Sequence, residues 1–252
     1  MHTTVSLTHR THVHVYLDTP NTNKPQALII FIPGLLETAD TPLFVNTTKA
    51  LSRLGKFATA RINSITFYGT TSTLDRTSIS GQVQEIEDLL THFRKTFDHV
   101  TLVAHSMGAF VSLLADISVV DSLIMWDPSL HPRKIFASTL YSEPNGNYYD
   151  TQLKRVVSTT LAKELPLLQD IQSVANNIKC PVGIISAGRG AVSIVDAYTQ
   201  HLPNLLGHIT IQDADHDFSD PQHTDRLINE TLHLIQKAAS QRDGYERLCT
   251  QQ

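Results

Sequence analysis

Residues 100–110 read VTLVAHSMGAF, a run of β-branched and apolar residues that meets one serine, Ser106, and then becomes a helical pattern. This order predicts a strand, a sharp turn and a helix, with Ser106 at the turn. Strand and helix nearly touch at such a turn, so the residues two before and two after the serine must be small, as Ala104 and Gly108 are. Met107 then offers its backbone N–H at a helix start, where the donors are unpaired and the dipole favours negative charge.

The pentapeptide around Ser106 resembles the G-x-S-x-G nucleophile elbow of the α/β-hydrolase superfamily, with Ala104 in place of the first glycine. The resemblance implies a serine nucleophile beside backbone donors that hold an oxyanion. It also implies an α/β fold in which helices flank both faces of a mostly parallel central sheet. A buried strand whose serine merely caps the next helix is the alternative interpretation.

Size and composition favour one folded domain, residues 1–252, with 41% hydrophobic and 17% charged residues. The net charge of −4, without a basic stripe, argues against a nucleic-acid partner. Cys180 and Cys249 form no metal or redox spacing, which favours reduced thiols in the cytoplasm. The first residues lack a signal-peptide pattern and no apolar run approaches membrane-spanning length, so we expect no membrane span.

Apolar patterning along the chain predicts strands that alternate with helices, which is typical of a parallel sheet covered on both faces. The predicted strands are 3–7 and 12–17 (a hairpin), 27–32, 57–62, 100–105, 119–126, 180–186 and 208–211. The predicted helices are 42–54, 80–93, the helix after Ser106, 193–202 and 221–239, and the polar tail from Ser240 is expected to fray.

Residues 129–179 break this alternation and resemble the short cap that many superfamily members insert between the sixth and seventh strands. We expect short helical pieces there, such as 152–162. The segment is too short for an independent domain. Its aromatic residues are expected to close an apolar pocket over a substrate, and they are Phe136, Tyr141, Tyr148 and Tyr149.

His216 follows the last predicted strand, in the segment ADHDF, which resembles the superfamily's Gly-x-x-His-x-Phe ending. An imidazole there can take the serine proton and return it to the leaving group. A divalent-metal cluster of His216 with Asp213, Asp215 and Asp217 is the rival interpretation. Consecutive loop residues cannot all point inward, so we expect no metal site.

The acid of the expected triad has two candidates. Many superfamily members carry it after the seventh strand, but that loop reads AGRGAV here and has no carboxylate. Asp127, directly after the strand that ends in Trp126, occupies the position that other members use, after the sixth strand. Asp196 is the fallback, and a turn or cap role is the alternative for Asp127.

The backbone N–H groups of Leu35 and Met107 are the predicted oxyanion donors. Pro33, Gly34 and Leu35 follow the buried strand 27–32, where superfamily members commonly read His-Gly-x. The donor is a main-chain group, so the missing histidine does not remove it.

The resemblance therefore predicts a serine hydrolase that acts by acyl transfer on a small or medium carboxylic ester or thioester, without a cofactor. Ser106 is the predicted nucleophile, His216 the base and Asp127 the residue that orients it. Another α/β-hydrolase reaction, such as C–C bond or peptide hydrolysis, is an alternative, and so is a non-catalytic binding protein on the same scaffold.

Overall fold

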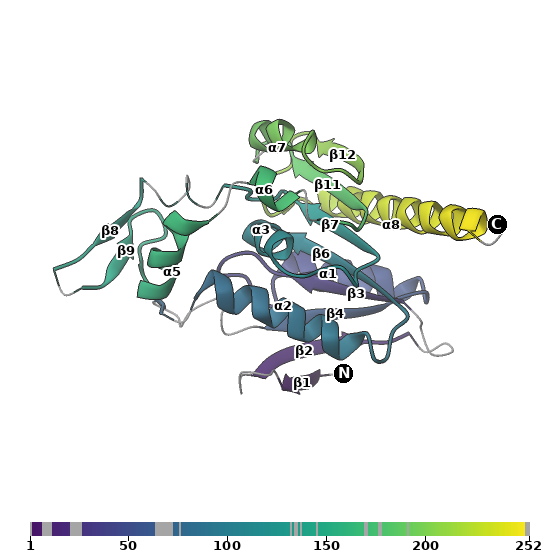
Figure 1. The fold of residues 1–252 in the computed structure, drawn as a ribbon, viewed down its shortest axis with the longest axis horizontal. Coiled ribbons are helices and arrows are strands. Elements are labelled where there is room, and N and C mark those ends of the chain that lie inside the picture. The colour runs from purple at the N-terminus through teal and green to yellow at the C-terminus, as the bar shows by residue number, and fades with distance from the viewer. Residues whose placement is uncertain are drawn as a thin grey trace.

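The structure, a computed structural model, describes residues 2–6, 12–20, 27–63, 73–75, 77–131, 133, 136, 138–144, 146–168, 171–175, 178–190 and 192–249. The turn expected at His9 and Arg10 lies outside these residues. Eight strands form one sheet in the order β1-β2-β4-β3-β6-β7-β11-β12 (Figure 1). The bounds are β1 His2–Ser6, β2 His12–Asp18, β3 Ala27–Ile32, β4 Ala58–Asn63, β6 His99–His105, β7 Ser122–Trp126, β11 Val182–Ala187 and β12 Leu205–Ile211.

Most of this sheet is parallel. β1 pairs antiparallel with β2 in the predicted hairpin, and β2 pairs antiparallel with β4. The other neighbouring strands, from β4 to β12, pair in parallel. The carboxyl ends of β3, β6, β7, β11 and β12 therefore share one edge of the sheet, which is where open α/β sheets bind ligands.

Helices cover both faces of the sheet. Alternate residues of a strand point to opposite faces, so Leu28, Ile30 and Ile32 of β3 enter one apolar cluster while Ile29 and Phe31 enter the other. The first cluster includes residues of α2 Ile79–Phe93, α3 Met107–Leu114 and α7 Val192–Thr199. The second includes residues of α1 Pro42–Arg53 and α8 Pro221–Cys249. Both faces of the sheet are therefore apolar core, as continuous apolar strands predict.

α8 is longer than the sequence indicated. The expected end near Ala239 and the frayed tail from Ser240 are wrong, because the helix continues to Cys249 and extends beyond the sheet edge (Figure 1). Most residues from Ser240 to Cys249 are polar, and one of them, Arg242, binds Asp121 just before β7 at 2.6 Å. Amphipathic periodicity locates only the part of a helix that packs on a core.

The insertion folds as a small sheet with short helices rather than as helical pieces alone. Residues 152–162, expected as a helix, form a turn, strand β10 Arg155–Val157 and the start of α5 Thr159–Glu164. β10 joins β8 Leu140–Ser142 and β9 Tyr148–Asp150 in a separate sheet of order β5-β10-β9-β8. A 3-10 turn, Leu165–Leu167, and α6 Ile171–Ala175 return the chain to β11. Strands of three residues are too short for an alternating pattern to reveal them.

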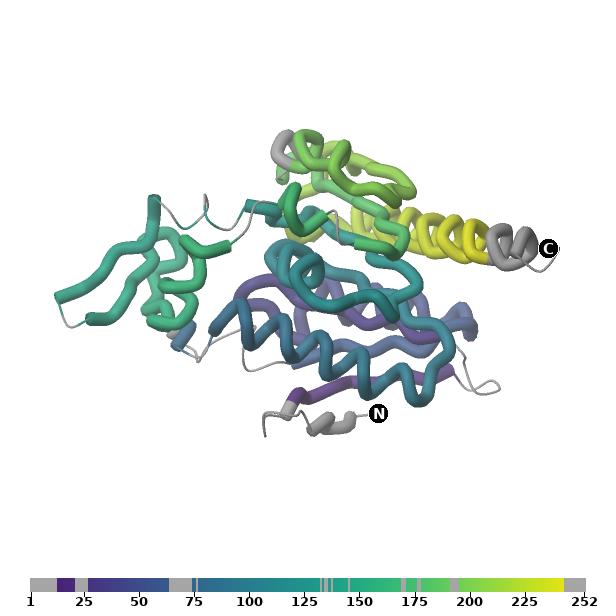
Figure 2. Tube along the Cα trace, in the orientation of Figure 1, coloured from purple at the N-terminus to yellow at the C-terminus, as the bar shows by residue number. Residues whose placement is uncertain are grey.

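A strand from outside the insertion completes this second sheet. β5, Thr73–Leu74, precedes α2 and pairs in parallel with β10, and Figure 2 shows it beside the teal and green insertion. Glu164 of α5 also accepts hydrogen bonds from the N–H groups of Ile79 and Ser80, at 2.6 and 3.3 Å. The insertion is thereby attached to the first turn of α2.

The turn between β6 and α3 requires close backbone contact. A Cβ on Gly108 would lie 2.3 Å from the carbonyl oxygen of Pro33 and 2.8 Å from that of Ile32. Ala104 is fully buried just before the turn. α3 therefore begins directly against the end of β3, and the small residues around Ser106 permit that approach.

Gly108→Ala is expected to destabilise the fold by about 3 kcal/mol, because the new methyl group meets backbone oxygens that cannot move aside. Gly207→Ala, in β12, is the matched control, since its Cβ would lie 3.9 Å from the nearest atom. That control should be neutral or stabilise by up to about 1 kcal/mol. Urea unfolding measures both, and equal effects would contradict the proposed contact.

Candidate active site

Ser106 occupies a strained position at the start of α3. Its φ of 52° and ψ of −123° lie in a region that residues with a side chain rarely adopt. The Ser106 N–H donates to the carbonyl of Trp126 at 3.0 Å, which ties the turn to β7. A Cβ on Gly34 would lie 2.8 Å from the Ser106 Cβ, so the loop after β3 passes directly beside the serine.

His216 lies on the loop after β12 and faces the serine. Its Nε2 is 2.9 Å from Ser106 Oγ, and its Nδ1 is 2.5 Å from Asp127 Oδ2. The imidazole side chain is 42% exposed, whereas Asp127 is fully buried. The structure thus brings together the three residues expected to form a triad, although Asp127 lies 89 positions and Ser106 110 positions before His216 in the sequence.

Asp127 directly follows β7, with a φ of 34°. Its Oδ1 accepts a hydrogen bond from the Ala187 N–H at 3.1 Å, at the end of β11. A Cβ on Gly190 would lie 2.1 Å from Asp127 Oδ2, so the carboxylate fills space that this glycine leaves open. The loop after β11, which lacks an acid of its own, therefore accommodates the acid from the neighbouring strand.

Asp196, the fallback acid, has a different partner. Its carboxylate lies 3.1 Å from Nδ1 of His208, and the Asp196 side chain is 65% exposed. His208 also contacts Ser186 Oγ through Nε2, at 2.8 Å. This second histidine–carboxylate pair involves β12 and α7 and does not line the cavity at Ser106.

A cavity of about 280 Å³ opens at Ser106. Its lining consists of Leu35, Ser106, Met107, Ser129, Phe136, Thr139, Asp150, Gln152, Leu153 and His216. Both expected oxyanion residues are thus beside the serine. Met107 is the first residue of α3, where an N–H has no acceptor within its own helix.

The aromatic residues of the insertion do not behave as a group. Phe136 lines the cavity, but Tyr141, Tyr148 and Tyr149 do not. The rings of Tyr141 and Tyr149 pack on each other at 5.6 Å across β8 and β9, and Tyr148 packs against the apolar core. Their expected role in the pocket is corrected: cross-strand pairing occupies two of the rings and core packing the third.

Sequence reasoning missed several cavity residues. Ser129 Oγ lies 3.2 Å from Ser106 Oγ, and the Ser129 N–H donates to the Ser106 carbonyl at 3.0 Å. Asp150 is buried and accepts hydrogen bonds from Thr139 Oγ1 at 2.5 Å and from the Leu153 N–H at 2.7 Å. These residues follow β7 or lie in short strands and turns, and no spacing in the sequence marks them.

Glu37 and His105 form a buried ion pair behind the elbow. Glu37 Oε2 lies 2.9 Å from His105 Nδ1. Burial opposes charge on both groups, but their mutual attraction and hydrogen bond hold the pKa of Glu37 below its ordinary 4.5 and that of His105 above its ordinary 6.5. Both shifts favour the charged forms of the pair, a carboxylate and an imidazolium.

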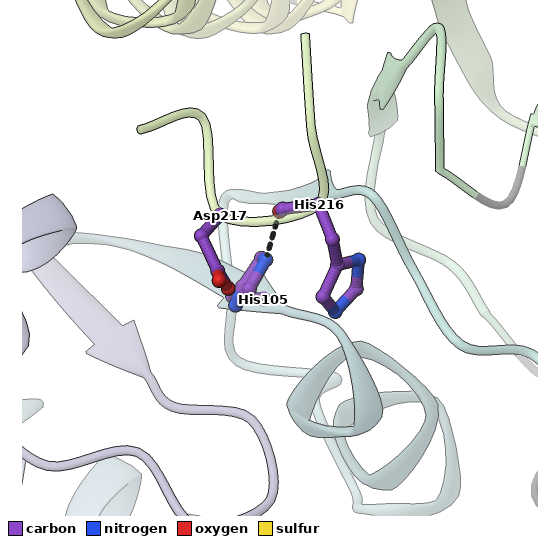
Figure 3. Close-up of side chains that lie close together, drawn as sticks. All are labelled: His105, His216 and Asp217. Carbon is purple, nitrogen blue, oxygen red and sulfur yellow. Dashed lines mark hydrogen bonds between the residues drawn. The ribbon is translucent and has the colours of Figure 1, made fainter. Parts of the chain in front are cut away.

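His105, His216 and Asp217 each bring one potential metal-ligating atom within 4.8 Å of the others (Figure 3). The nitrogens of His105 are already engaged, however. Nε2 lies 2.9 Å from the His216 carbonyl oxygen, which can only accept, so Nε2 carries a proton, and Nδ1 contacts Glu37. A metal would need a free lone pair on His105, and this hydrogen bonding leaves none.

Cys180 is buried with a free thiol. Burial raises the pKa of this thiol to about 12, so it is not a reactive nucleophile near neutral pH. The side chain of Cys249 lies outside the described residues.

Among the helices that the structure describes, none combines the length and apolar character needed to cross a membrane.

No protein-family model matches the sequence, and no curated protein matches it. Solved structures do match. Est1E from Butyrivibrio proteoclasticus has a TM-score of 0.76 at 15% identity, over 95% of this chain and 99% of that chain. The α/β hydrolase GrgF from Penicillium sp. sh18 has a TM-score of 0.71 at 14% identity, over 94% and 98%. Dienelactone hydrolase from Anabaena variabilis has a TM-score of 0.63 at 15% identity, over 94% and 97%.

The likeness to these proteins defines the class. The chain has the α/β-hydrolase fold, as the elbow around Ser106 predicted. In this chain Ala104 lies two residues before Ser106, and an aspartate, Asp127, directly follows β7.

The Glu37–His105 pair predicts a pH-dependent stability. A carboxylate with a lowered pKa stabilises the fold fully above pH 4.5, and an imidazole with a raised pKa does so fully below pH 6.5. Glu37→Gln should therefore lower the free energy of unfolding most between these values, by about 3 kcal/mol at pH 5.5. The loss should shrink as the pH rises through the folded pKa of His105. Urea unfolding at pH 5.5 and 9 measures it, and a loss that does not change with pH would contradict the ion pair.

Proposed function

We propose that the protein is a serine hydrolase that acts by acyl transfer on a small or medium carboxylic ester or thioester. The observation that carries the proposal is the 2.9 Å contact between Ser106 Oγ and His216 Nε2, two residues that line one cavity. A serine hydroxyl is a weak nucleophile, and an imidazole at this distance is the base that activates it.

In the proposed mechanism, Ser106 Oγ attacks the acyl carbonyl while His216 Nε2 takes the serine proton. Asp127 accepts from Nδ1–H of His216, which fixes the tautomer and stabilises the imidazolium that forms. The N–H groups of Leu35 and Met107 hold the tetrahedral oxyanion. His216 then protonates the leaving group, and water attacks the acyl-enzyme by the same route to release the acid.

The cavity supports a substrate of modest size. Its volume of about 280 Å³ is at the lower end for small-molecule sites. The cavity has an apolar wall that can contact an acyl group, formed by Leu35, Met107, Phe136 and Leu153.

We also propose a cytoplasmic location, because Cys180 is a free thiol.

A fluorophosphonate probe tests the nucleophile. Wild-type protein should be labelled covalently on Ser106, and Ser106→Ala should take up no label in intact-mass measurements. Ser129→Ala, which alters the neighbouring hydroxyl, is the matched control and should still be labelled. Failure of the wild type to react, under conditions that label a known serine esterase, would reject the proposal.

Asp127→Asn should lower kcat on a p-nitrophenyl ester by about 10³- to 10⁴-fold, because the amide no longer holds His216 in the required tautomer. Asp196→Asn is the control and should leave kcat unchanged. Rates measured on p-nitrophenyl esters of graded acyl length show which acyl length the protein prefers. A ferulate ester belongs in the panel, because a structure of Est1E is described with ferulic acid bound. Equal rates for Asp127→Asn and wild type would remove Asp127 from the mechanism.

A further inference from the structure

Glu37 and His105 contact both loops that flank Ser106. Glu37 Oε2 accepts a hydrogen bond from the Gly34 N–H, in the loop after β3, and pairs with His105 Nδ1 at 2.9 Å. His105 Nε2–H donates to the carbonyl of His216, in the loop after β12, at 2.9 Å. His105 itself is the last residue of β6, next to Ser106. Three segments that are distant in sequence are thereby joined through two side chains.

The pair is well shielded from solvent. The side chain of His105 is 1% exposed and that of Glu37 is 14% exposed. The ring of Phe44, from α1, meets His105 edge-on at 6.4 Å. The charged and titratable groups that face His105 are Glu37, Asp217 and His216, whose ring centroid is 4.7 Å away. Hydrogen bonds in such a poorly hydrated place hold their geometry firmly.

These contacts fix main-chain atoms rather than side chains. The Gly34 N–H precedes Leu35, whose own N–H is the proposed oxyanion donor. The His216 carbonyl belongs to the same residue whose ring is the proposed base. A shift of either loop would therefore move a catalytic group relative to Ser106 Oγ, and a misplacement of about 1 Å can lower a rate by about 10²-fold.

We infer that Glu37 and His105 act as a positioning pair that holds the oxyanion loop and the His216 loop in their working places around Ser106. The inference rests on the proposed hydrolase function. Neither residue is among those that line the cavity, so the inferred role does not need contact with the substrate. The pair acts on catalysis only through the groups that it holds.

This arrangement predicts an effect on kcat rather than on KM. The cavity wall formed by Phe136, Gln152 and Leu153 belongs to the insertion, whereas the hydrogen bonds of the pair reach Gly34 and His216. Removing the pair leaves that wall in place but releases the two loops. The pair also works as a unit, because each member reaches only one loop and needs the other as its anchor.

Glu37→Gln, His105→Gln and the double variant test the inference on a soluble p-nitrophenyl ester. Each single variant should lower kcat about 10- to 100-fold, with KM within about threefold of wild type. The double variant should be no slower than the worse single variant, because the second change breaks a link that is already lost. A purely structural defect would instead reduce the fraction of active protein, which fluorophosphonate titration counts separately.

Asp196→Asn and His208→Gln are the matched controls, since they break a histidine–carboxylate pair of similar length that lies outside the cavity. Both should keep wild-type kcat. His105→Asn provides a second side chain at that position, so the test does not depend on one variant that folds poorly. Thermal unfolding is recorded for every variant.

Three results would overturn the inference: single variants with wild-type kcat per titrated site, effects that multiply in the double variant, or a change confined to KM. These results leave the hydrolase proposal intact, because they are measured on variants of an active enzyme. A wild type that neither takes the probe nor hydrolyses esters would overturn both proposals.

Discussion

The close approach of α3 to the end of β3 is the constraint on which the rest of the site depends. Without a Cβ at Gly108, the helix starts against the Pro33 carbonyl. That contact brings the loop after β3 beside Ser106 and holds the serine at a positive φ. The same packing places Met107, the first residue of the helix, at the cavity, and its N–H has no acceptor within its own helix. The positions of the proposed nucleophile and of the proposed oxyanion donor Met107 thus have one steric origin.

The proposed acid, Asp127, depends on the adjacent ends of two neighbouring strands, β7 and β11. β7 and β11 are adjacent and parallel, so their carboxyl ends lie next to each other. Asp127, from the end of β7, contacts both the His216 ring and the Ala187 N–H at the end of β11. Gly190, in the loop after β11, leaves room for this carboxylate. The two loops are complementary, because one carries the carboxylate and the other has a glycine, Gly190, where a side chain would collide with it.

The elements that pack on the core could be predicted from the sequence, and so could the proximity of Ser106, Asp127 and His216. Each of the three residues follows a strong strand signal, and parallel strands end at a common edge. The positions of Glu37 and Ser129 could not be predicted, because loop residues acquire neighbours only through the path of the chain. The tyrosines of the insertion were misassigned because aromatic content does not reveal which face of a short strand a ring occupies. α8 was predicted too short because most residues after Ala239 are polar and do not continue the apolar pattern.

The shared sheet of β5 and β10 gives the insertion a second anchor in the body of the protein. Leu74 also accepts a hydrogen bond from the Ser158 N–H at 3.1 Å, and Glu164 binds the first turn of α2. Residues 129–179 are therefore not a separable module: excision would strip β5 of its partner strand and leave helix donors without their carboxylate. A transplant of this segment onto another scaffold would have to bring residues 73–80 with it, so the two regions are expected to be inherited and to diverge together.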